Sequence, residues 1–126
     1  MSDFENYKVE AMEKWGSTEA YKEQIEKTKN YSKDKWNNLS EEMDNIFKDF
    51  SICMKNAEKL SSENVQSLVK KLQKYITDNY YHCSNEILKG LGQMYILDKR
   101  FKTNIDKHAD GTAEFVSKAI EIFCNN

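Results

Sequence analysis

The chain has 126 residues, of which 39% are hydrophobic and 32% are charged, and its formal net charge is −2. This length fits one domain, and without a basic stripe the chain lacks the charge that direct nucleic-acid binding requires. No apolar run approaches the ~18–20 residues that span a bilayer, and no signal-peptide core is present, so we expect a cytoplasmic protein.

The first 30 residues predict two short helices, over 3–15 and 18–29, separated by Gly16. Isolated helices of this length are marginal in water. We therefore expect residues 1–30 to need something to lie against, either the other helices or a ligand. The apolar side chains available to them are Phe4, Tyr7, Met12, Trp15, Tyr21 and Ile25.

The remaining residues predict a helical core, because apolar side chains recur at three- and four-residue spacing and no run shows β-alternation. The first stripe comprises Trp36, Leu39, Met43, Ile46, Phe47, Phe50, Cys53 and Met54. Five helix starts are marked by a favoured N-cap or a glycine: Ser32, the Ser61-Ser62 pair, Ser84, Asp98 and Gly111. We expect an all-α bundle of about five to seven helices.

The three cysteines, Cys53, Cys83 and Cys124, are an odd set without CxxC spacing. This pattern favours reduced thiols over a disulfide framework. A structural zinc site needs four ligands with recognisable spacing, and neither histidine lies on a clear apolar helical face that would suit haem. We expect no metal and no cofactor.

Cys83 lies directly before a predicted helix start, where the helix dipole should lower the pKa of the thiol. His82 is its neighbour in sequence, so its side chain should point elsewhere and make a poor general base. We favour a role for Cys83 in closing the turn and keep a reactive, drug-inactivating thiol as the alternative. The function that we expect is therefore not enzymatic.

Gly90 and Gly92 lie inside a helical pattern with no strand before them, which excludes a phosphate loop. Glycine in a helix costs about 1 kcal/mol relative to alanine. The pair therefore indicates either close helix packing, which we favour, or a ligand that lies against bare backbone.

The aromatic residues fall into two groups. Trp36, Phe47, Phe50 and Phe123 follow helix stripes and are predicted to be mostly core. Trp15 and most of the tyrosines suit a cleft, because each offers a flat apolar face with one polar tip. Met94 adds an adaptable surface.

Two blocks carry a resemblance to a known family: residues 10–36, EAMEKWGSTEAYKEQIEKTKNYSKDKW, and residues 80–111, YYHCSNEILKGLGQMYILDKRFKTNIDKHADG. Their elements WG-x-T-x-A-Y and C-S-x-E…GLG-x-MY…D-x-RF-x-x-NID are specific. In order and spacing, essentially the whole chain resembles the TipA-S-like antibiotic-recognition domain at the C-terminus of MerR-type transcriptional activators.

This resemblance implies an all-helical, globin-like fold with a deep cleft, in which residues 1–126 form a single domain. Residues 1–30 would be mobile lid helices and residues 31–126 the helical core. The implied ligands are thiopeptide-like or other bulky heterocyclic antibiotics. We predict these ligand-binding residues: Trp15, Tyr21, Tyr31, Tyr80, Tyr81, Cys83, Gly90, Met94 and Tyr95.

The chain departs from the family in two respects. The thiopeptide receptor that names the family captures its ligand covalently through a cysteine, and the matching position, seven residues after Cys83, is Gly90 here. Covalent capture by that route is therefore not available. The winged helix-turn-helix and coiled coil of MerR activators are also missing, so we expect a monomer that binds no promoter alone.

Two forms fit that absence: a stand-alone, drug-sequestering protein, or a fragment of a full-length activator. The alternative function is a helical protein–protein interaction module without a small-molecule ligand. Trp15 and Tyr21 would then be interface anchors.

Overall fold

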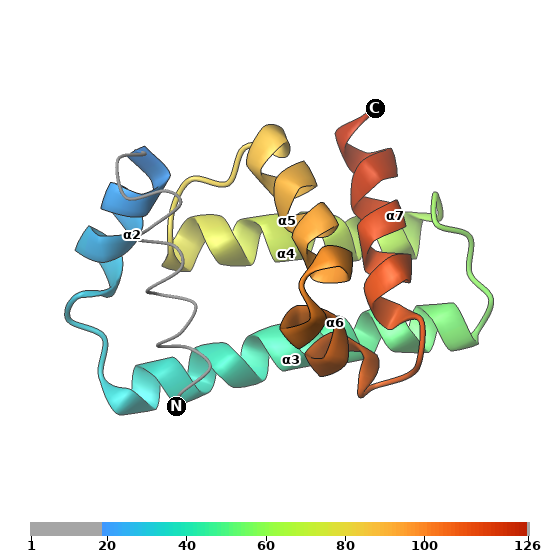
Figure 1. Cartoon of the computed structure of the whole chain (residues 1–126), viewed down its shortest axis with the longest axis horizontal. Coiled ribbons are helices and arrows are strands. Elements are labelled where there is room, and N and C mark those ends of the chain that lie inside the picture. The colour runs from blue at the N-terminus through green and yellow to red at the C-terminus, as the bar shows by residue number, and fades with distance from the viewer. Residues whose placement is uncertain (1–18, 126) are drawn as a thin grey trace.

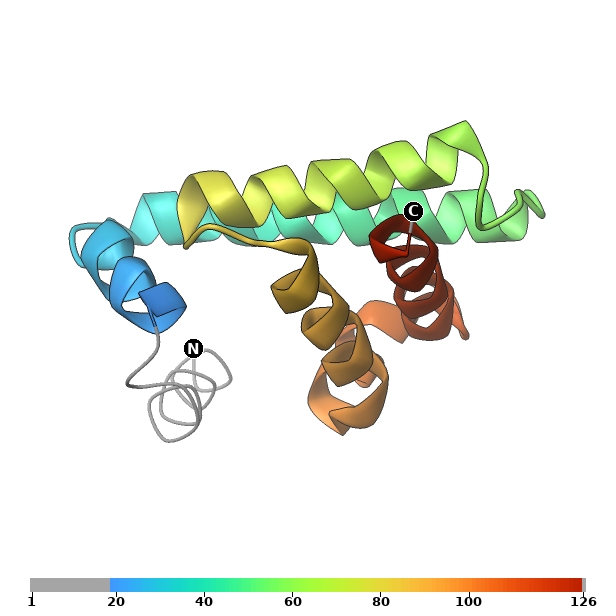
Figure 2. The same ribbon diagram turned by 90° about the horizontal axis from the view of Figure 1, so that it is seen from above.

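The computed structural model describes residues 19–125, and this part of the chain forms six helices and no strand. Helices α3 (Lys33–Lys55) and α4 (Glu63–Asn79) run antiparallel and form one layer (Figure 1). Figure 2 shows α5 (Asn85–Leu97), α6 (Lys99–Asp106) and α7 (Thr112–Cys124) as a second layer on one side of that pair. The all-helical prediction is confirmed.

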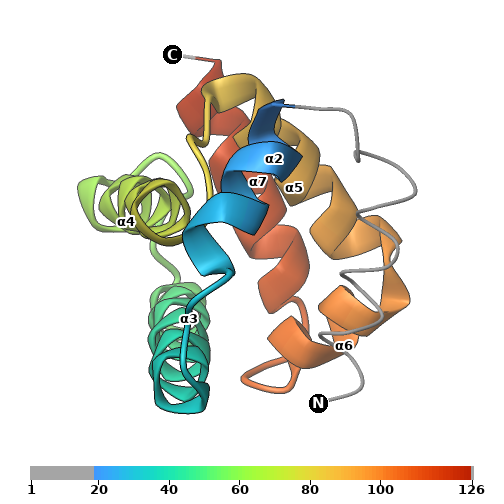
Figure 3. The same cartoon turned by 90° about the vertical axis from the view of Figure 1, so that its left-hand side faces the viewer.

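Helix α2 (Glu19–Thr28) lies at the end of the long pair where α4 finishes, on the same side as the second layer (Figures 2 and 3). It packs against α4. The helix predicted over 18–29 corresponds to α2, whereas the helix predicted over 3–15 lies outside the described residues.

Local capping explains where the other helices begin. The side chains of Ser32, Ser62 and Ser84 accept the backbone N–H groups of Lys35, Val65 and Ile87, and Asp98 accepts that of Arg100. Each of these bonds satisfies an N–H that has no partner within its own helix. The predicted helix starts at these four positions are confirmed.

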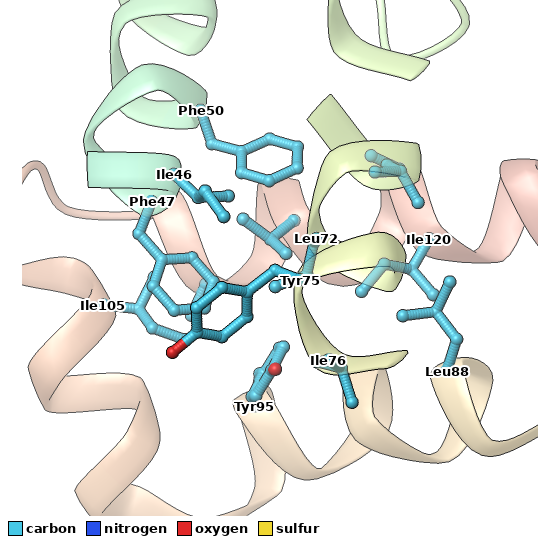
Figure 4. Close-up of a cluster of buried hydrophobic side chains, with 14 of the residues drawn as sticks. Ile46, Phe47, Phe50, Leu72, Tyr75, Ile76, Leu88, Tyr95, Ile105 and Ile120 are labelled. Atoms are coloured by element: carbon cyan, nitrogen blue, oxygen red, sulfur yellow. The ribbon is translucent and has the colours of Figure 1, made fainter. Parts of the chain in front are cut away.

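The core lies between the two layers and is built mainly from the predicted stripes, together with tyrosines from α4 and α5 (Figure 4). The largest fully buried side chains include Phe50, Ile46, Leu72, Leu88, Tyr95, Ile105 and Ile120. Two residues that the stripes predicted as mostly core, Trp36 and Phe123, are only partly buried. Both pack against the edge of the core: Trp36 in the first turn of α3, and Phe123 in the last turn of α7.

Helix α7 obtains its cap from the preceding helix. Gly111 takes a left-handed φ of 90° and offers no side chain. Asp106 supplies the missing acceptor, since its Oδ1 accepts the N–H of Ala113 at 2.8 Å, while Oδ2 lies 2.8 Å from Lys102 Nζ. Burial raises the pKa of the Asp106 carboxyl group, whereas these hydrogen bonds lower it. Their effect is the larger one, so the pKa lies below the ordinary 3.8.

The two glycines of α5 have different surroundings. A Cβ built on Gly92 would lie 3.2 Å from Ile120 Cγ2, so this glycine permits the close packing of α5 on α7 that the sequence favoured. A Cβ on Gly90 would meet nothing within 4 Å in the described part of the chain. Packing therefore accounts for Gly92 and not for Gly90.

Candidate functional site

The C-terminal end of α4 is held by side chains from the segment before α3. Lys27 Nζ donates to the carbonyl of Thr77 at 2.8 Å, and the Tyr31 hydroxyl donates to the carbonyl of Asn79 at 2.6 Å. Carbonyls in the last turn of a helix lack intrahelical partners and carry partial negative charge. Because α4 has no basic residue in its own last turn, Lys27 supplies the complementary charge from α2.

A third contact joins α2 to the turn that follows α4. Glu23 Oε1 accepts the backbone N–H of His82 at 2.9 Å, and this hydrogen bond lowers the pKa of Glu23. We call the contacts made by Glu23, Lys27 and Tyr31 the α2 clasp. The clasp is polar throughout, and it places α2 beside the Tyr80-Tyr81 pair.

Aromatic rings gather next to the clasp. The Tyr31 and Trp36 ring centroids lie 5.3 Å apart at 68°, and those of Trp36 and Tyr80 lie 6.2 Å apart. Tyr80 in turn meets Tyr75 at 5.8 Å. Edge-to-face contacts at these distances are favourable beyond the area that they bury. The Tyr75 ring is held in place by α3, because its hydroxyl donates to the Leu39 carbonyl at 2.8 Å.

The series of rings continues into the second layer. Tyr95 packs edge-on against Phe47, with ring centroids 5.6 Å apart, and in a tilted arrangement against Phe101, with centroids 5.7 Å apart. Figure 4 shows the Tyr75, Phe47 and Tyr95 side chains pointing toward one another. We call the whole series the ring track; it comprises Tyr31, Trp36, Tyr80, Tyr75, Phe47, Tyr95 and Phe101. Its half-buried members are Tyr31, Trp36, Tyr80 and Phe101.

Helix α5 presents a second apolar surface. Ile87, Leu91 and Met94 are half-buried at four- and three-residue spacing, and Leu97, three residues further on, is 81% exposed. Gly90 lies on the same helix face, where its missing side chain leaves backbone uncovered. We call this surface the α5 stripe.

In this arrangement the Cys83 thiol is shielded from solvent and from a dissolved ligand. It is 2% exposed, and burial raises its pKa to about 11, with a smaller contribution from the neighbouring Cys124. The prediction that the helix dipole would lower its pKa is therefore wrong, because desolvation of the thiolate outweighs the dipole. Its N–H bonds to Thr77 Oγ1 at 3.1 Å, which agrees with the favoured role in closing the turn.

A family model for the TipAS antibiotic-recognition domain matches residues 7–123. The chain belongs to this family. A solved structure described as the thiopeptide antibiotic nosiheptide in complex with TipAS, from Streptomyces lividans, superposes with a TM-score of 0.84 and 34% identity. The superposition covers 96% of this chain and 83% of that one, so the globin-like fold expected from the resemblance is confirmed.

Longer proteins also match. The HTH-type transcriptional activators TipA of Streptomyces coelicolor and Streptomyces lividans are each 35% identical over 118 residues, which is 94% of this chain. The activator mta of Bacillus subtilis is 30% identical over 129 residues and covers 100% of this chain. The chain spans about half the length of these relatives: 47% of each TipA and 49% of mta.

The TipAS domain places the predicted site residues in three environments. Tyr21, Tyr31, Tyr80, Tyr81 and Met94 are half-buried, and Gly90 is exposed on the α5 stripe. Cys83 and Tyr95 are each 2% exposed and lie in the core, where a ligand would reach them only after local movement. Trp15 lies outside the described residues.

Sequence reasoning missed other residues of these surfaces. Trp36 and Phe101 belong to the ring track, and Leu91 and Leu97 to the α5 stripe. The sequence pattern predicts Trp36 as a core residue because it begins an apolar helix stripe. The available signal was its position in the first turn of that helix, where coverage by the second layer ends.

Other groups in the described residues do not add to the site. No cluster of three or more histidine, cysteine, aspartate or glutamate side chains could hold a metal ion, and no helix there is long and apolar enough to cross a membrane. A polar surface pocket of ≈ 80 Å³ between α5 and α7 is lined by Lys89, Gln93, Ser117 and Glu121. It is small beside the ~300 Å³ at which ligand sites usually begin.

Proposed function

We propose that this TipAS domain binds thiopeptide-like or other bulky heterocyclic antibiotics across the ring track and the α5 stripe. The observation that carries the proposal is the likeness to nosiheptide-bound TipAS, at 34% identity and a TM-score of 0.84. The half-buried rings and the uncovered backbone at Gly90 support it, because both offer surface to a flat apolar ligand.

The chemistry of recognition would be apolar contact with a few polar anchors. Burial raises the pKa of both Tyr80 and Tyr81, so their hydroxyls stay neutral at physiological pH. A neutral phenol donates one hydrogen bond and accepts others. These two hydroxyls therefore suit the carbonyl oxygens and ring nitrogens of a heterocyclic peptide.

Binding at Gly90 would be non-covalent, because that position carries no nucleophile. Cys83 is an unsuitable substitute, since its thiol is buried and its pKa is raised to about 11. Catalysis has no support in the described residues for the same reason. We propose a binding domain that does not turn over its ligand.

Residues 1–30 would act as the lid and residues 31–126 as the helical core. The α2 clasp supports this division, because Glu23 and Lys27 join α2 to the core through two polar contacts that can exchange with water. Tyr21 and the 38% exposed Ile25 give α2 apolar surface for a ligand. In the cell the domain would be the effector part of a MerR-type activator or a monomeric, drug-sequestering protein.

The test titrates nosiheptide into the parent chain and into a Trp15→Phe variant, in which Trp36 in the ring track is the one remaining tryptophan. We expect saturable quenching and a higher Tm with nosiheptide. Met94→Ala should weaken binding about tenfold, which is about 1.4 kcal/mol. The matched control is Ile52→Ala, since Ile52 is 44% exposed on α3 away from both surfaces and should bind as the parent does.

Equal affinity of Met94→Ala and the parent would remove the α5 stripe from the site. No response to nosiheptide or to a panel of large heterocyclic antibiotics would overturn drug binding. The interaction-module alternative would then have to be tested with protein partners.

A further inference from the structure

Helix α7 ends near the start of α5, directly after the turn that follows α4 (Figures 1 and 3), and two thiols from distant parts of the chain lie against this stretch. Cys124 Sγ donates to the Asn85 carbonyl at 3.3 Å. Cys83 Sγ contacts the Ser84 carbonyl at 3.8 Å. These two acceptors are consecutive carbonyls of the chain, so both sulfur atoms lie against the same short stretch of backbone.

The electrostatics agree with this placement. Burial raises the pKa of Cys83, and the second cause is the nearby Cys124. An interaction between two thiolates of this kind falls off with distance. The third thiol, Cys53, is 8% exposed on α3, where the charged groups that act on it are Glu58 and Asp49.

We propose that Cys83 and Cys124 form a reversible disulfide in the presence of a peroxide. Cys124 is the more exposed of the two thiols and reacts first: it takes one peroxide oxygen to become a sulfenic acid, and the first water leaves. The Cys83 sulfur then displaces the hydroxyl group, which departs as a second water. Two thiols are oxidised by two electrons, and one peroxide is reduced to two waters.

Of the two partners of the cross-link, the turn that carries Cys83 is the one held by further hydrogen bonds. Gln73 Nε2 donates to the Cys83 carbonyl and to Asn85 Oδ1, both at 2.9 Å. Cys124 is the last residue of α7, and the last turn of a helix frays at little cost.

The disulfide would join α7 to the turn that carries Tyr80, Tyr81 and His82. It would close a loop of roughly 40 residues and so reduce the entropy of the unfolded chain. It would thereby stiffen the turn between the α2 clasp and the α5 stripe under oxidising conditions. This inference does not depend on which ligand the domain binds.

The experiment treats the folded chain with hydrogen peroxide, blocks remaining thiols with iodoacetamide, and digests it with trypsin without reduction. Cleavage after lysine separates the three cysteines into peptides 49–55, 75–89 and 119–126. We expect 75–89 linked to 119–126, with Cys53 alkylated in 49–55. Dithiothreitol should release the pair, and the Tm of the oxidised protein should be higher by about 5 °C or more.

Two variants provide controls. Cys124→Ser should abolish both the linked peptide and the rise in Tm, and its partly exposed site makes it the safer variant to fold. Cys53→Ser should keep both effects. The proposal is overturned if peptide 119–126 carries only sulfinic or sulfonic acid, if the link joins two chains, or if the linked protein melts no higher than the reduced one.

Discussion

The two glycines of α5 should respond to the same substitution with opposite signs. Gly90 is exposed within the helix, and a Cβ there would meet nothing within 4 Å. Replacing a helical glycine by alanine reduces the entropy of the unfolded chain and improves helix propensity, which is worth about 1 kcal/mol. For a domain of this size that corresponds to a rise in Tm of roughly 4 °C.

The same gain in propensity is available at Gly92, but packing opposes it. The new methyl carbon would lie 3.2 Å from Ile120 Cγ2 and 3.3 Å from its Cδ1. Ile120 is 1% exposed, and its branched side chain has few rotamers with which to move away. Overpacking of this kind costs about 1–3 kcal/mol, so we expect Gly92→Ala to be less stable than the parent by up to about 2 kcal/mol.

The assay is thermal and urea unfolding of the parent, Gly90→Ala and Gly92→Ala, combined with nosiheptide titration. Gly90→Ala should melt higher yet bind nosiheptide more weakly, because the methyl group occupies backbone surface of the α5 stripe. A loss of stability in Gly90→Ala, or a gain in Gly92→Ala, would refute the packing argument. Unchanged nosiheptide affinity in the stabilised variant would exclude Gly90 from the ligand contact.

Three further changes test the clasp, the α7 cap and the non-covalent mode. Lys27→Met should accelerate hydrogen exchange of the α2 amides and leave those of α7 unchanged, since it removes the contact to the Thr77 carbonyl and the ion pair with Glu23 within α2. Equal exchange in both proteins would contradict the clasp. Asp106→Ala should lower stability at pH 7 by about 2 kcal/mol in urea unfolding. Because the pKa of Asp106 is lowered in the folded state, its contribution to stability is fully present above the ordinary pKa of 3.8 and is lost as pH falls through the folded pKa. The free energies of unfolding of parent and variant should therefore converge in acid. A difference that stays constant with pH would argue against a charged cap. Gly90→Cys restores the cysteine that the family resemblance implies for covalent capture, so it should gain the mass of one nosiheptide, whereas the parent should not. No adduct would show that residue 90 does not face the ligand.

Much of the fold follows from local rules. A serine or aspartate side chain reaches an N–H only two or three residues further along the chain, so Ser32, Ser62, Ser84 and Asp98 mark their helices without any tertiary information. The same argument fails for α7. Its cap comes from Asp106, which lies outside the helix and reaches Ala113 only because the chain turns at Gly111.

The site was less predictable. Apolar periodicity gave the helix faces that bear Tyr80, Met94 and Tyr95, but it could not separate half-buried residues from buried ones. Trp36 and Tyr95 both follow their stripes, yet only Tyr95 is enclosed, by Phe47 and Phe101. That distinction depends on how far the second layer extends over α3, which local sequence does not encode.

The sequence by itself determined the helical class, the capped helix starts and the TipAS resemblance, because capping, periodicity and motif spacing act over a few residues along the chain. The tertiary structure decided which rings remain half-exposed, why Gly92 is required for packing and Gly90 is not, and why the pKa of Cys83 rises. Each of these depends on desolvation or contact by residues far away in the chain. Burial is a property of the assembled layers, and no single helix carries it.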